Sequence, residues 1–206
     1  MMGKLREQNR LAREFIRGDF SSQLWISAVA FPVLMILGFV LGILIDDLAA
    51  NFVTTFTSQL ADNGVMGEDG TIHLPALLYN NLRASVFTIC YGFIPMLFLP
   101  ALSLGINALL LGFFAAYYYI NGMSMLFFFA AIIPHGIFEI PALVLSIALG
   151  LYLCRIITNY VRHNEKGIVR TALYHILRVF VLRAVPLFAI ASVVESYITP
   201  WIITLI

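Results

Sequence analysis

Three ionisable side chains lie inside long apolar stretches of this chain, and they are the residues best placed to do chemistry. His135 and Glu139 occur within "FFFAAIIPHGIFEIPALVLS" (residues 127–146), and Glu195 lies in a later apolar run. On a helix, residues four apart share a face, so His135 and Glu139 would point the same way. Ionisable groups at membrane depth are costly and face the protein interior, which makes them a functional hypothesis by default.

Further polar residues are expected near this group. Asn80, Asn81 and Arg83 directly precede residues 84–120, a stretch without any charge, and we expect them at the outer mouth of a membrane span. Asn107 is expected to hydrogen-bond the backbone of a tight turn, because such a turn must be satisfied within the protein. The predicted binding or structural polar cluster, which opens outward, consists of Asn80, Asn81, Arg83, Asn107, His135, Gly136, Glu139 and Glu195.

Three interpretations of the cluster stay open. It is a structural network if Glu139 pairs with Arg83 or His135. It is a transport site if it binds a substrate or a proton, as ionisable residues beside broken helices do in many transporters. It is a zinc site if His135, Glu139 and Glu195 hold a metal whose bound water attacks a peptide or lipid bond. The chain has no H-E-x-x-H motif and offers one buried His, so we expect no metal, no cofactor and no catalytic residue.

Composition places the cluster in a membrane. Of 206 residues, 61% are hydrophobic and 11% are charged, with a mean hydropathy of +0.94. Soluble domains carry roughly 25% charged residues. Several apolar runs reach the roughly 20 residues that a bilayer-spanning helix needs. The sequence therefore predicts an all-α, polytopic helical membrane bundle, and it does not indicate nucleic-acid binding.

The distribution of charge predicts the orientation of this bundle. Basic residues concentrate before residue 18 and between Arg155 and Arg183. Residues 46–82 contain no Lys or Arg. They do contain five acidic residues, namely Asp46, Asp47, Asp62, Glu68 and Asp69. Because cytoplasmic loops are enriched in Lys and Arg, the N-terminus and the later basic segment are predicted inside and residues 46–82 outside.

The chain divides into seven predicted segments within a single membrane domain. They are a cytoplasmic basic helix (1–24), a first span (25–45), an external amphipathic segment (46–82), a helical hairpin that turns near Pro100–Asn107 (83–120), a broken helix with a span (121–157), a cytoplasmic basic segment (158–183) and a last span (184–206).

The fifth of these segments is longer than one crossing requires. Counting back about 20 residues from Arg155 places the start of its span near His135. Residues 123–133 are then spare, and we expect a short re-entrant or interfacial helix there, broken at Pro134–Gly136. The prediction is five full spans plus this one partial helix, with a cytoplasmic N-terminus and an external C-terminus.

Four stretches together resemble the stage II sporulation protein M family of bacterial and archaeal membrane proteins, over about residues 25–200. They are "LLYNNLRASVFTICYGFIPMLFLPALSLGINALLLGFF", "NG", "IIPHGIFEIPALVLSIALGL" and "AIASVVESYITP". The resemblance implies a fold of five to six spans. Carried over by position, it makes signature residues of Asn80, Asn81, Asn107, His135, Gly136, Glu139 and Glu195.

The resemblance also implies a role. In spore formers, the family's namesake is a membrane scaffold that recruits the stage II sporulation proteins D and P, which degrade peptidoglycan, during engulfment. We therefore expect a non-enzymatic scaffold or complex subunit in a bacterial cell membrane, whose partners are the lipid bilayer and proteins such as peptidoglycan-degrading enzymes. Partners would dock on residues 46–82, and Gly38-x-x-x-Gly42 offers a homo-oligomer contact. A transporter-like component and, less strongly, an intramembrane metal-dependent hydrolase are the alternatives.

Overall fold

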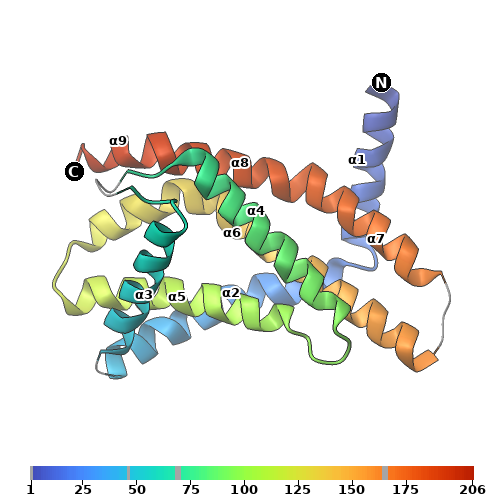
Figure 1. Cartoon of the computed structure of the whole chain (residues 1–206), viewed down its shortest axis with the longest axis horizontal. Helices are drawn as coiled ribbons and strands as arrows, with labels where there is room; N and C mark the ends of the chain where they lie inside the picture. The colour runs from blue at the N-terminus through green and yellow to red at the C-terminus, as the bar shows by residue number, and fades with distance from the viewer. Residues whose placement is uncertain (1, 46, 68–70, 164–166) are drawn as a thin grey trace.

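The chain folds into a bundle of helices in the computed structural model, which describes residues 2–45, 47–67, 71–163 and 167–206 (Figure 1). In this described part, an isolated bridge between Met66 and Ile72 is the only β-pairing. The α-helices are α1 (Met2–Arg17), α2 (Ser21–Leu44), α3 (Leu48–Asp62), α4 (Leu74–Cys90), α5 (Pro100–Ile120), α6 (Met125–His163), α7 (Ile168–Val179), α8 (Val185–Val193) and α9 (Thr199–Ile203).

Helices α7, α8 and α9 form one continuous helical segment. Two π-helical turns, Phe180–Ala184 and Val194–Ile198, connect them without a loop. The sequence predicted that a basic segment ends at residue 183 and that the last span begins after it. In the structure no helix ends there, because the helical segment continues through this position. The first residues of that predicted segment, 158–163, belong to α6.

Among the described residues, four helical segments are long and apolar enough to cross a membrane, namely α2, α5, α6 and the continuous α7–α9 segment. Large apolar side chains on α2, such as Trp25, Val33 and Ile36, are more than half exposed, as lipid-facing residues are. Helix α4 is shorter, with 17 residues. The chain is thus a multi-pass membrane protein, and a fifth full span stays a prediction.

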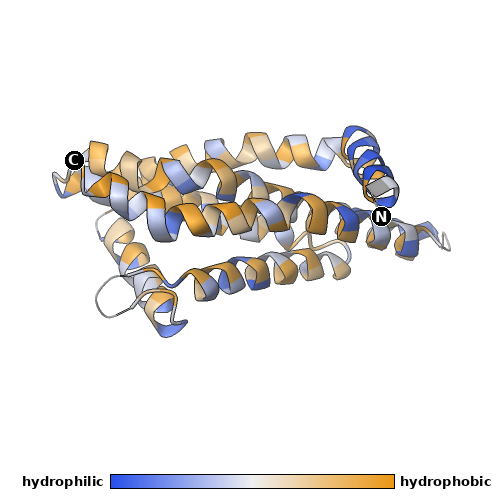
Figure 2. Cartoon of the chain, turned by 90° about the horizontal axis from the view of Figure 1, so that it is seen from above, coloured by the Kyte–Doolittle hydropathy of each residue, from blue (hydrophilic) through white to orange (hydrophobic). Residues whose placement is uncertain are grey.

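Two helices lie across the long axis of the bundle at its opposite ends (Figure 1). Helix α1 carries exposed Lys and Arg side chains, and hydrophilic residues cover it in Figure 2. Helix α3 crosses the other end, where Asp47 and Asp62 are exposed. The predicted acidic residues Asp46, Glu68 and Asp69, and the basic Lys166, lie outside the described residues. The described charges therefore separate into a basic end and an acidic end.

Helix α6 is the centre of the bundle, and every other long helix packs on it. Its second half is continuously buried from Val144 to Gly150. Leu149 and Leu153 are fully buried in a cluster with Phe188 of α8 and Phe20, just before α2. A polar group on the inner face of α6 is thus held by several helices at once.

The predicted break at Pro134–Gly136 is wrong, because α6 is continuous through both Pro134 and Pro141. Each proline removes one N–H donor and bends the helix, but the neighbouring helices that bury α6 allow it to continue. Figure 1 shows the first turns of α6 running in a different direction from the rest. Gly136 is an ordinary helical position, where an added Cβ would meet other side chains only at 3.6 Å.

The connection between α4 and α5 lies at residues 91–99, earlier than the predicted Pro100–Asn107 turn. Pro100 begins α5 because its missing N–H is tolerated in a first helical turn. The Met96 backbone N–H donates to Thr158 Oγ1 at 3.0 Å, and Cys154 Sγ donates to the Ile94 carbonyl at 3.4 Å. The connection is therefore satisfied by protein, as expected, but by side chains of α6.

Gly38 and Gly42 pack inside the chain, against α5. A Cβ added to Gly38 would lie 2.5 Å from the Leu109 carbonyl oxygen, and one added to Gly42 would lie 2.7 Å from Ala116 Cβ. Small residues let two helix backbones approach this closely. Helices α2 and α5 run parallel along this contact, so the face predicted for a homo-oligomer is already occupied.

Candidate functional site

His135, Glu139 and Glu195 converge between α6 and the second π-helical turn. One ligand atom of each residue lies within 4.8 Å of the other two. His135 Nε2 is 3.9 Å from Glu139 Oε2, and both side chains are largely buried, with 12% and 29% exposed. The structure thus brings together three members of the predicted cluster, from segments far apart in the sequence.

Helical geometry explains how these side chains meet. His135 and Glu139 are one turn apart on α6, so they lie on the same face. Glu195 belongs to the π-helical turn Val194–Ile198, a local irregularity that is frequent at functional sites. Thr199, one turn further on, places its Oγ1 3.5 Å from His135 Nδ1. The face of this segment that contains Glu195 and Thr199 is therefore the face that packs on α6.

No Lys or Arg side chain pairs with the two carboxylates in the part of the chain that the structure describes. Of the two partners expected for Glu139, Arg83 is not found beside it, because Arg83 is exposed and its guanidinium lies 5.8 Å from the ring centroid of Tyr79. His135 is the only ion-pair partner of Glu139 among the described residues. Two carboxylates at this separation repel each other in apolar surroundings.

Two serine hydroxyls beside Glu195 have no hydrogen-bond partner among the described residues. Ser192 is fully buried, and Ser196 Oγ is also inaccessible. Ser192 precedes Glu195 by three residues, so it lies on the same side of the helix. Buried hydroxyls are normally satisfied, and an orphan one needs an explanation.

Three further residues of the predicted cluster lie on α4 and α5. Asn80 and Asn81 are inside α4, which starts at Leu74, and their place at the mouth of a span stays a prediction. Asn107 donates from Nδ2 to the Ser103 carbonyl at 2.8 Å, within its own helix. Among the described residues, no recorded hydrogen bond joins these asparagines to the His135, Glu139 and Glu195 group. Asn81 Nδ2 is buried without a partner there.

Hydroxyl residues that bridge helices were missed by the sequence reasoning. Thr199 contacts His135, Thr158 binds the α4–α5 connection, and Thr88 Oγ1 is 2.9 Å from Ser103 Oγ. The signal that was available for Thr199 is its spacing, since it follows Glu195 by one helical turn. Thr and Ser commonly form interhelical hydrogen bonds in membrane bundles.

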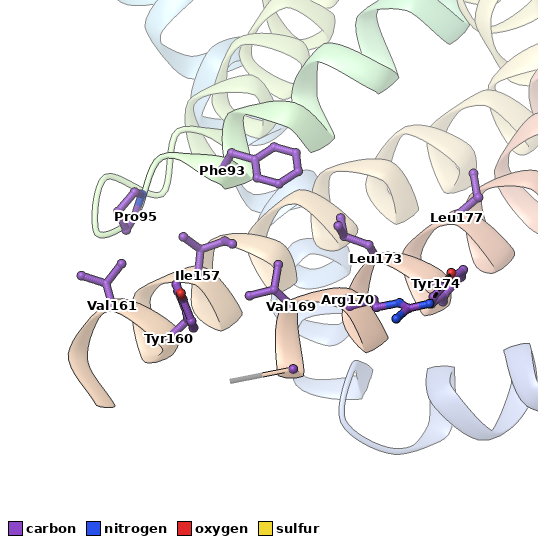
Figure 3. A pocket seen from close by; sticks show the side chains of 11 residues that line it. Phe93, Pro95, Ile157, Tyr160, Val161, Val169, Arg170, Leu173, Tyr174 and Leu177 are labelled. Carbon is purple, nitrogen blue, oxygen red and sulfur yellow. Dashed lines mark hydrogen bonds between the residues drawn. The ribbon is translucent and has the colours of Figure 1, made fainter. Parts of the chain in front are cut away.

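Two apolar cavities open on the sides of the bundle, and neither includes a residue of the predicted polar cluster. One, of about 840 Å³, lies between the α4–α5 connection, the end of α6 and α7, and Arg170 and Tyr174 line it (Figure 3). The other, of about 990 Å³, lies between α2 and α6 beside Trp25 and Pro141. Neither is the expected outward polar cavity.

The convergent group offers one imidazole nitrogen and carboxylate oxygens from two residues. Nitrogen and oxygen donors of this kind are ligands for divalent transition metals. The same group could instead share protons between its two carboxyls. The arrangement therefore suits the binding of a cation or a proton, and it places either between α6 and the segment after α8.

Comparisons with known proteins place this geometry in a family. The family profile of Stage II sporulation protein M matches residues 22–200. One uncharacterized protein of Methanocaldococcus jannaschii is 31% identical over 137 residues, which cover 65% of this chain and 59% of that protein. Another from the same organism is 25% identical over 173 residues, which cover 84% of this chain and 95% of that protein. No solved structure matches the chain. The matched residues run from the second residue of α2 through α8, so the chain belongs to the Stage II sporulation protein M family.

Proposed function

We propose that this protein is a non-enzymatic scaffold or complex subunit of the membrane, which holds partner proteins at the end of the bundle that α3 crosses. The observation that carries the proposal is α3 itself. This helix lies across the bundle as a structured element and not as a loose connection between spans (Figure 1).

Aromatic contacts hold α3 on the bundle. The rings of Phe52 and Phe113 are 4.8 Å apart, and those of Phe56 and Phe114 are 5.8 Å apart. Val53 is buried on the same side of α3. Such pairs of aromatic rings contribute about 0.5–1.5 kcal/mol beyond the area they bury. The helix is thereby fixed in one orientation relative to α5.

The other side of α3 presents a polar surface. Its exposed residues include Asn51, Thr55, Ser58, Gln59 and Asp62. A fixed helix with an uncovered polar face suits docking by another protein with little ordering cost. Residues 46–82 contain five acidic residues and no Lys or Arg, so a partner with a basic surface fits best. Cell-wall-remodelling enzymes are the class to test first, because the family's namesake recruits such enzymes.

Site-specific photocrosslinking in living cells tests this proposal. A photoreactive amino acid at Thr55 or Gln59, on the exposed face of α3, should give a discrete adduct with a cell-wall-remodelling enzyme of the host. The same amino acid at the lipid-facing Ile36, or at the exposed Leu5 of α1, should not give that adduct. Equal adducts at all four positions, or none at the α3 positions, would contradict docking on α3.

Transport is not proposed as a second function, because the two cavities described above are apolar and neither is lined by His135, Glu139 or Glu195. The scaffold proposal assigns no reaction to His135, Glu139 and Glu195.

A further inference from the structure

We propose that His135, Glu139 and Glu195 bind a divalent transition-metal ion, with Zn²⁺ as the first candidate, and that the ion joins α6 to the helical segment after α8. The proposal does not depend on docking at α3. It rests on three observations around the same point, which are the donor atoms, the contact to the second nitrogen of the imidazole and the uncompensated charge.

The donor atoms are of the right type and almost at the right separation. Zinc binds imidazole nitrogen and carboxylate oxygen at about 2.0–2.2 Å, so neighbouring tetrahedral ligands lie about 3.4 Å apart. The structure has His135 Nε2 at 3.9 Å from Glu139 Oε2 and all three donors within 4.8 Å. Glu side chains have three rotatable bonds, so small rotations of Glu139 and Glu195 close the remaining gap.

The His135 ring is held as a ligand would be. Its Nδ1 lies 3.5 Å from Thr199 Oγ1, while Nε2 faces Glu139. Metal-binding histidines generally use one ring nitrogen for the metal and the other for a hydrogen bond that fixes the ring orientation. Thr199 and His135 come from the two segments that the ion would join.

An ion would also balance the charge of the group. Glu139 and Glu195 have no Lys or Arg partner among the described residues. A divalent cation between them neutralises both carboxylates in a place where unpaired charge is costly. Three protein ligands leave a fourth position of a tetrahedral ion to water.

The π-helical turn at Glu195 is consistent with this role. A π-helical turn inserts one extra residue into a helix and shifts the positions of the side chains around it. Here the turn Val194–Ile198 contains Glu195 and is followed directly by Thr199. The irregularity thus lies at the place where one side chain must reach the proposed ion and another must reach His135.

Metal content of the purified full-length protein tests the proposal. The protein is stripped with a chelator, reloaded with ZnCl₂, separated from free metal and analysed by mass spectrometry together with its thermal melting temperature. We expect roughly one bound zinc per chain and a higher melting temperature with zinc than without. The variants Glu139→Gln, Glu195→Gln and His135→Gln should each lose the bound zinc and the shift.

Matched control variants separate this site from adventitious binding. Glu14→Gln on α1 and His73→Gln before α4 change the same residue types at exposed positions, and both should keep the bound zinc. Zinc retained by all three cluster variants would place it elsewhere and overturn the proposal. If the cluster variants do not fold, X-ray absorption of the loaded wild-type protein decides. One nitrogen and two carboxylate ligands support the site, whereas folded wild-type protein without zinc refutes it.

Discussion

Thr158 supplies the hydrogen bond that closes the connection between α4 and α5. The side chain is buried, with 7% exposed, and its Oγ1 accepts from the Met96 backbone N–H. Met96 has a left-handed backbone, with φ of 68°, so its N–H points away from any regular helical partner. Met96 is 49% exposed, so the hydrogen bond is only partly buried, and a bond of this kind contributes about 0.5–1.5 kcal/mol.

We therefore expect Thr158→Val, which keeps the shape and removes the hydroxyl, to lower the free energy of unfolding by about 0.5–1.5 kcal/mol. Thr158→Ser keeps the hydroxyl and should retain most of the stability. Thermal melting in detergent, followed by size-exclusion chromatography, measures both. Equal melting temperatures for the Val variant and the wild type would show that the bond contributes nothing.

The candidate site could be predicted from residue types, but its partners could not. His135 and Glu139 stood out because ionisable residues are rare in apolar runs, and their spacing fixed their common face. Glu195 is brought close to them by the packing of α6 and α8, and no local sequence pattern specifies that packing. The pairing of Glu139 with Arg83 failed because the Arg83 side chain extends to the ring of Tyr79 on its own helix.

At the scale of the elements, the contact between α2 and α5 depends on glycine in both helices. A Cβ at Gly38 would meet the Leu109 backbone at 2.5 and 2.8 Å, and a Cβ at Gly112 would lie 2.6 Å from the Phe39 nitrogen. Backbone atoms cannot move aside as a flexible side chain can. The two helices must separate if either glycine gains a side chain.

We expect Gly38→Ala and Gly112→Ala each to destabilise the protein by about 1–3 kcal/mol, the usual cost of overpacking. Gly105→Ala is the matched control on α5, because a Cβ there meets nothing within 4 Å. It should be neutral or stabilising, since Ala favours helices by about 1 kcal/mol over Gly. Melting temperatures of the three variants check this, and a loss as large at Gly105 as at Gly38 would contradict the packing argument.

The helices were predicted well where a long apolar run has clear ends, and poorly where prolines occur. The first span was expected at 25–45 and α2 is Ser21–Leu44. Pro134 suggested a broken helix, but α6 passes through it, and α8 and α9 pack on α6. Tertiary burial decides whether a proline ends a helix or only bends it, and the local sequence does not contain that information.

At the scale of the whole molecule, the two transverse helices define its ends. Phe15 of α1 stacks on Phe20 at 5.3 Å and on His175 of α7 at 4.8 Å, which fixes α1 against the bundle. The Arg155 side chain donates to the Asp19 carbonyl at 2.9 Å at the same end. The described basic residues of α1 and α7 thus gather at one end, and α3 with its acidic residues lies at the other. If positive charge stays inside, the α1 end is cytoplasmic.

Cysteine labelling in intact cells tests this orientation. The natural Cys90 and Cys154 are first replaced by Ala, and single cysteines are introduced as Gln59→Cys on α3 or Arg162→Cys at the end of α6. Both positions are exposed, whereas Val65 in the α3–α4 connection is 1% exposed and would report poorly. We expect a membrane-impermeant maleimide to label the Gln59 variant in intact cells and the Arg162 variant only after permeabilisation.

The cysteine-free chain is the control for background labelling, and both variants must label equally in detergent. The opposite pattern, with Arg162→Cys labelled from outside, would reverse the predicted orientation. It would then place α3 in the cytoplasm, where a cell-wall-remodelling partner could not reach it. Docking of a cell-wall-remodelling partner on α3 therefore requires the predicted orientation, whereas the proposed metal site at His135, Glu139 and Glu195 is compatible with either orientation.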